Sequence, residues 1–159
     1  MKATVALLLL VVVGPSMADD AKEETRAKVA FVADVTMFEG TFYSVLDYCA
    51  PYAGQAVANL TKADWLNQNS KLLKSRDVVH NELIGEFAAD KETADQMRAW
   101  REGIFSKARE EDRAYSDILG SANMVLACSK RLGEMVSDSM TFRRIAPKSF
   151  AYWSQEAQR

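Results

Sequence analysis

Histidine is nearly absent from this chain, which contains a single one, His80. Carboxylate-bridged di-iron bundles need an acidic-x-x-His motif on each of two helices, whereas this chain has one related spacing, from Asp77 to His80. Neither a Cys-x-x-Cys-His motif for covalent haem nor a Gly-x-Ser-x-Gly motif for a hydrolase nucleophile occurs. We therefore expect no catalytic residues, no resident metal and no cofactor.

An excess of basic residues is also missing. The chain has 20 lysine and arginine residues against 22 aspartate and glutamate residues, which gives a formal net charge of −2. A surface that binds nucleic acid needs a basic excess to neutralise the phosphates. We therefore expect no nucleic acid among the partners.

Cysteine is limited to two residues, Cys49 and Cys128. In an oxidising compartment, two thiols in a small domain usually pair. A bridge between them would close a loop of about 80 residues, for which the chain-entropy model gives on the order of 4 kcal/mol. We predict this disulfide, which would also remove the thiols from any structural zinc site. The alternative is two buried free thiols or one reactive thiol.

The longest apolar run lies at the N-terminus and has the parts of a secretory signal peptide. Lys2 supplies a positive charge, residues 3–13 are apolar with one exception, and small residues lead up to Ala18. Eleven residues span only about 16 Å as a helix, against about 30 Å of bilayer hydrocarbon. We therefore predict a cleaved signal peptide at 1–18 and one domain over 19–159.

Proline and glycine are scarce as well, with three and seven residues in the whole chain. Few helix breakers, and apolar residues in steps of three and four, predict an all-α fold. Because helices with one apolar face and short connections pack best side by side, we expect a small antiparallel bundle of about four main helices. The predicted disulfide would join the first of these helices to the fourth.

The first helix is predicted over 21–49, with Pro51 ending it because proline disfavours helix at the preceding residue. A short helical piece over 52–60 should follow. Thr61 is then predicted to cap the second helix, with Asp64 in the third helical position. The apolar stripe of the first helix consists of Val32, Val35, Phe38, Phe42, Val45 and Cys49.

Asp90 is predicted to cap the third helix. One helix over 91–140 would be about 75 Å long, too long for so small a domain, so a break is expected. The favoured position is Gly120-Ser121, because glycine ends helices and serine starts them. The charged run at 109–113 is the other candidate, although it fits a solvated helix face. A last short helix is predicted over 147–158.

The C-terminal tail mixes cations with aromatic residues in an otherwise acidic protein. Arginine, tyrosine and tryptophan are enriched where binding energy concentrates at protein interfaces. The helical spacing of Phe150 and Trp153 favours a tail that packs back onto the bundle with its charges facing water, and both interpretations stay open. The candidate interface comprises Arg143, Arg144, Lys148, Tyr152 and Trp153.

Asp77 and His80 form a weaker alternative site. Residues three apart share a helix face, so with a third ligand the pair could hold a metal. His80 with a methionine could hold haem, and a pocket beside them could take a small ligand or serve an enzyme. The simpler interpretation is that Asp77 orients a partly exposed His80.

These features predict an exported, non-enzymatic helical module that binds another macromolecule, periplasmic if the source is bacterial and otherwise secreted. The expected partner is another protein of the cell envelope or outside the cell. By analogy with small exported helical domains, the role would be that of an adaptor, chaperone, inhibitor or immunity-type protein. Contact of the tail with an anionic membrane surface is a further hypothesis. The alternative function is a small-ligand, haem or metal carrier, or an enzyme, at Asp77 and His80.

Overall fold

The computed structural model describes residues 19–111, 115–137 and 141–156. The predicted signal peptide lies outside these residues. The described part of the chain is helical, without strands, which confirms the predicted all-α fold. Its helices are α2 (Asp19–Ala53), α3 (Gln55–Phe87), α4 (Lys91–Glu110), α5 (Met124–Met135), α6 (Phe142–Ile145) and α7 (Pro147–Glu156).

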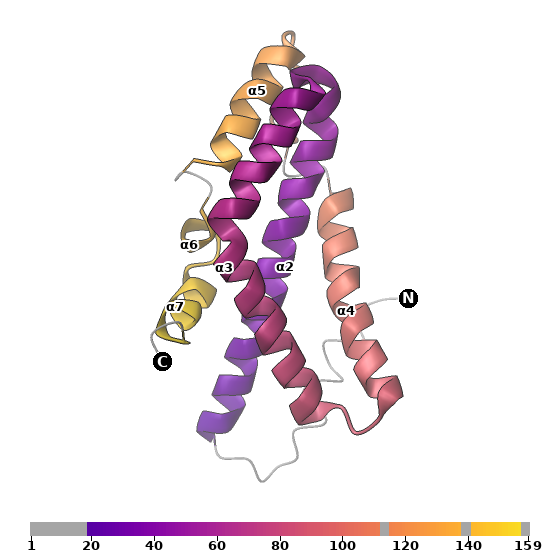
Figure 1. The fold of residues 1–159 in the computed structure, drawn as a ribbon, viewed down its shortest axis with the longest axis vertical. Coiled ribbons are helices and arrows are strands. Elements are labelled where there is room, and N and C mark those ends of the chain that lie inside the picture. The colour runs from indigo at the N-terminus through magenta and orange to yellow at the C-terminus, as the bar shows by residue number, and fades with distance from the viewer. Residues whose placement is uncertain (1–18, 112–114, 138–140, 157–159) are drawn as a thin grey trace.

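Helix α2 forms the centre of the bundle and contacts α3, α4, α5 and α7. Successive long helices run in opposite directions, with α4 on one side of α2 and with α5 and α7 on the other (Figure 1). All six residues of the predicted apolar stripe are buried. Within the described residues, Ala21–Ala53 is also the one helical segment long and apolar enough to cross a membrane. Since 56% of its most apolar window is buried in the bundle, it has the pattern of a core helix.

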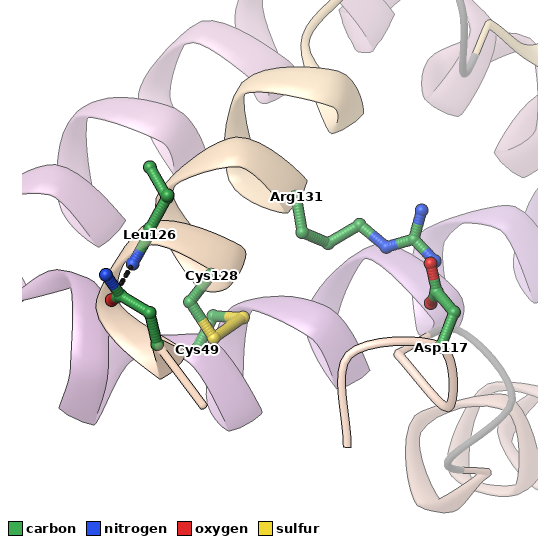
Figure 2. Close-up of a disulfide and its surroundings, with 6 residues drawn as sticks. Cys49, Asp117, Leu126, Cys128 and Arg131 are labelled. Carbon is green, nitrogen blue, oxygen red and sulfur yellow. Dashed lines mark hydrogen bonds and ion pairs between the residues drawn. A yellow bond between two sulfur atoms is a disulfide. The ribbon is translucent and has the colours of Figure 1, made fainter. Parts of the chain in front are cut away.

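The predicted disulfide is present. Cys49 of α2 and Cys128 of α5 are bonded, with Cα atoms 5.1 Å apart, and both side chains are fully buried. Figure 2 shows the bond between the last turns of α2 and the first turns of α5. The first and fourth long helices are therefore clamped at one end of the bundle, as expected.

The chain departs from prediction at Pro51, which does not end the first helix. Helix α2 continues to Ala53, because proline removes only one backbone donor and the N–H of Gly54 donates to the Ala50 carbonyl at 3.0 Å. The turn occurs at Gly54, whose φ of 91° lies in the left-handed region that favours glycine.

The predicted separate helix over 52–60 is consequently wrong. Helix α3 starts at Gln55 and runs without interruption to Phe87. Thr61 lies inside this helix, where its side chain is buried, so neither Thr61 nor Asp64 caps a helix start. One glycine, Gly54, makes the reversal for which the sequence predicted two breaks, at Pro51 and before Thr61.

The break between the third and fourth long helices begins earlier than the favoured Gly120-Ser121 position. Helix α4 ends at Glu110, within the charged run at 109–113 that is the second candidate. The hydroxyl of Ser44 donates to the Glu111 carbonyl at 3.0 Å, so α2 itself holds the end of α4. Both predicted positions belong to the connection between α4 and α5, because Gly120 lies there as well, with φ 74°.

Side-chain caps fix two helix starts. The Asp90 carboxylate accepts the Thr93 N–H at 2.8 Å, as predicted for the start of α4, and this hydrogen bond lowers the pKa of Asp90. Helix α5 is capped by Asn123, whose Oδ1 accepts the Leu126 N–H at 3.0 Å. Ser121, the predicted starting residue, lies before this cap.

Candidate functional site

The C-terminal helix α7 is held against α2 and α3 by specific polar contacts. The Ser149 hydroxyl donates to Asp34 of α2 at 2.6 Å. The Trp153 indole N–H donates to the Ser75 hydroxyl of α3 at 3.0 Å. Aromatic packing adds to this, because the Tyr152 ring lies against a core phenylalanine of α2. The apolar side of the tail therefore packs on the bundle, as the packing alternative expects.

Docking of the tail creates an open groove of about 740 Å³ between α3, α6 and α7, which we call the tail groove. Cationic groups line it from two parts of the chain, Lys71 of α3 together with Arg143 and Arg144 of α6. Its apolar surface comes from α3 and from the tail. The residues that supply this apolar surface are Leu72, Phe142, Phe150 and Trp153.

The charged residues that the structure describes in the lining of the tail groove are all cations. Among the described residues no carboxylate lines it, and the remaining lining groups are the uncharged side chains of Gln68, Asn69 and Thr141. The Arg143 guanidinium lies 5.8 Å from the centre of the Phe150 ring, which places the cation over the apolar surface. The groove thus joins positive charge with aromatic surface in a protein of net charge −2.

The five residues of the predicted interface do not form one surface. Arg143, Arg144 and Trp153 line the tail groove. Lys148 and Tyr152 line a different groove of about 800 Å³ against the first turns of α2. That second groove contains Glu23 beside its cations, so its charge is mixed. Lys148 and Tyr152 of α7 thus lie toward the first turns of α2, whereas Trp153 of the same helix and the two arginines of α6 lie toward α3.

The contribution of α3 to the tail groove could not be found in the sequence. Lys71 is an exposed lysine on a long helix, which is the ordinary state of lysine. It lies about 70 residues before Arg143 in the chain, and only the docking of the tail brings the two to one groove. No local pattern at Lys71 signals this neighbour.

At the alternative site, arginine side chains contact both Asp77 and His80. The Asp77 carboxylate accepts from Arg76 at 3.0 Å and from Arg101 at 2.9 Å. Arg76 is itself buried and pairs with Glu39 of α2. Asp77 therefore pairs with two guanidinium groups, rather than orienting the histidine as the simpler interpretation expects.

His80 is buried, contrary to the expectation of partial exposure. Its Nε2 lies 3.2 Å from the Met97 carbonyl and its Nδ1 lies 3.4 Å from Arg101. A carbonyl only accepts and a guanidinium only donates, so Nε2 carries the proton and the Nδ1 lone pair faces Arg101. Burial lowers the pKa of His80, and the charge of Arg101 adds to this. The ring is a neutral link between α3 and α4 whose lone pair already has a partner.

The tail groove thus differs from the cluster of Arg76, Asp77, His80 and Arg101 in what it offers a ligand. The groove is open and presents cations and aromatic surface, whereas the polar atoms of the cluster contact one another. No group of three or more histidine, cysteine, aspartate or glutamate side chains placed to hold a metal occurs in the part of the chain that the structure describes.

Comparison with protein-family models, with curated proteins and with solved structures gives no match to this chain.

Proposed function

We propose that this protein is an exported, non-enzymatic binding module that captures an acidic segment of a partner protein in the tail groove. The observation that carries the proposal is that every charged residue described in the lining of this groove is a cation. Lys71, Arg143 and Arg144 surround an aromatic surface, and no described lining residue is acidic. The protein as a whole is slightly acidic, so the groove is where an acidic segment would be attracted.

The chemistry of the groove suits a peptide segment. Arginine forms paired hydrogen bonds with carboxylates, and desolvated aromatic pockets hold the side chains that dominate interface energies. A volume of about 740 Å³ lies in the range of small-ligand sites, so it accommodates a few side chains. The expected occupant is a short stretch with several carboxylates and at least one aromatic or large aliphatic side chain.

Export is supported by the apolar N-terminal segment and by the disulfide. The bond between Cys49 and Cys128 fits an oxidising compartment, because thiols of cytosolic proteins are normally kept reduced. The partner is accordingly a protein of the cell envelope or outside the cell, in the periplasm if the source is bacterial. Asp77 and His80 lend no support to the alternative carrier or enzyme, since their polar atoms already contact arginines and a backbone carbonyl.

The test is a selection of random peptides displayed on phage, followed by affinity measurement with the enriched peptides by fluorescence anisotropy. We expect enrichment of acidic peptides, and at least tenfold weaker binding to a Lys71→Gln/Arg143→Gln double variant. Lys74→Gln is the matched control, because Lys74 is exposed on the same helix outside the groove. Trp153 is left intact, since its bond to Ser75 makes it part of the packing.

Two results would refute the proposal. One is a selection that yields no enrichment of aspartate and glutamate. The other is a double variant that binds the enriched peptides as tightly as Lys74→Gln does. Thermal unfolding of all variants accompanies the measurement, and we expect it to change little because the replaced side chains are exposed.

A further inference from the structure

Two segments of the chain contain no charged residue. Residues 48–61 and 118–129 together make up 26 positions without lysine, arginine, aspartate or glutamate. At the chain-wide frequency of 26% charged residues, about seven would be expected there. The first segment joins α2 to α3, and the second leads into α5.

The fold brings the two segments to the same end of the molecule. The disulfide joins Cys49 in the first to Cys128 in the second. The Tyr48 ring also stacks on Tyr115, just before the second segment, with ring centres 4.0 Å apart. Figure 1 shows the α2–α3 turn and the start of α5 together at one end of the long axis. We call this end, formed by residues 48–61 and 118–129, the uncharged tip.

The uncharged tip exposes large apolar side chains. Among the described residues, six of the nine large apolar side chains that are exposed belong to it, and each is between 42% and 67% exposed. Such a concentration is unusual for a surface that contacts only water. The six are Tyr52, Val57, Leu60, Leu119, Val125 and Leu126.

The two carboxylates that directly precede the segments of the tip are paired with arginines. Asp47 precedes the first segment and pairs with Arg109 at 2.6 Å. Asp117 precedes the second segment and pairs with Arg131 at 2.7 Å, and Figure 2 shows this pair beside the disulfide. Both segments are followed directly by a lysine. Each segment of the tip is therefore preceded by a paired carboxylate and followed by a lysine.

We propose that the uncharged tip inserts into the interfacial region of a lipid bilayer. Hydrocarbon tolerates apolar side chains and excludes charge, which matches the composition of the tip. Tyrosine and lysine are the residue types found at the level of the lipid headgroups, where Tyr52, Lys62 and Lys130 would lie. Insertion to about 5–10 Å leaves the turn backbones near the headgroups and water.

A protein partner fits the tip less well. A standard protein–protein interface uses about 20–30 residues on each side, whereas six exposed apolar side chains at the end of a narrow bundle make a small surface. A bilayer needs no complementary shape and adapts to a protruding end. The tail groove belongs to α3, α6 and α7, away from this end in Figure 1, so lipid and peptide binding do not compete for one surface.

The test is co-sedimentation of the purified protein with phosphatidylcholine vesicles at 0.05 and 0.5 M salt. We expect binding that changes little with salt, because the tip carries no charge. Leu60→Asp and Leu126→Asp should each lower the partition coefficient at least tenfold. Val78→Asp is the matched control, since Val78 is 56% exposed on the same helix as Leu60 but far from the tip. All variants share the same N-terminus, so their differences report the tip alone.

Several outcomes would overturn the proposal. The first is the absence of binding to these vesicles, and the second is an equal effect of Val78→Asp and the tip substitutions. Binding that needs phosphatidylglycerol and disappears at 0.5 M salt would assign membrane contact to the cationic residues instead. Dimerisation in analytical ultracentrifugation that is lost with Leu60→Asp would show that a second copy covers the tip. Unfolding temperatures of the variants exclude a folding defect as the cause of lost binding.

Discussion

Replacement of Gly40 by alanine tests how closely α2 and α4 approach each other. Gly40 lies in the middle of α2, where an added Cβ would be 2.7 Å from the Ala108 Cβ and 2.8 Å from the Phe105 carbonyl oxygen of α4. Neither atom is the end of a flexible side chain, so α4 must shift to make room. Gly40 therefore marks a close approach of α2 to α4.

The expected magnitude follows from two opposing effects. Alanine stabilises a helix interior by about 1 kcal/mol relative to glycine, while forcing an extra carbon into a packed contact costs about 1–3 kcal/mol. We expect Gly40→Ala to lower the free energy of unfolding by about 1 kcal/mol. Gly103→Ala is the matched control in α4, because its added Cβ would meet no atom within 4 Å. That variant should gain up to about 1 kcal/mol.

Urea unfolding of the wild type and both variants measures the difference. We expect equal slopes and midpoints that move in opposite directions, with the two variants about 2 kcal/mol apart. In thermal unfolding this corresponds to about 4–8 °C for a chain of this size. A Gly40→Ala variant that is stabilised as much as Gly103→Ala would refute the close packing of α2 on α4.

Three further predictions concern the disulfide, the buried histidine and the N-terminus. Replacing Cys49 and Cys128 together by alanine should lower the free energy of unfolding by about 4 kcal/mol at most, since the open chain regains loop entropy; a loss below 1 kcal/mol in chemical denaturation would contradict this. Burial lowers the pKa of His80 in the folded state, so below pH 6.5 the unfolded chain binds a proton more readily than the folded protein does. The neutral buried ring therefore contributes fully to stability above pH 6.5, and we expect the free energy of unfolding to fall as the pH drops below that value. His80→Gln should flatten this part of the stability profile, and an unchanged slope would show that another group titrates. Protein purified from producing cells should begin at Asp19 in N-terminal sequencing, and a chain that still begins at Met1 would remove the basis for export.

The helices of this protein were largely predictable because their cause is local. The stripe from Val32 to Cys49 is buried as its spacing predicts, and Asp90 caps α4 with the hydrogen bond that its position suggests. The errors occurred where a turn depends on one residue. Gly54 reverses the chain without a capping side chain, and a glycine is a weak signal beside Pro51, which the helix tolerates.

The candidate site was predictable only in part. The cations of the tail stand out by composition, but their division between two grooves depends on how α7 is rotated against α2. The contacts of Ser149 with Asp34 and of Trp153 with Ser75 fix that rotation. Both join residues from distant parts of the chain, so no sequence pattern reports them.

The sequence alone determined that the chain is helical, which face of the first long helix is buried and that two cysteines are available for a bond. These properties follow from periodicity and residue chemistry within a few turns of chain. Tertiary structure decided that Lys71 joins Arg143 in one groove, that Gly40 faces α4 and that two uncharged segments meet at one tip. The physical reason is that such meetings depend on how whole helices cross and dock, which the sequence encodes only through the packing of the entire core.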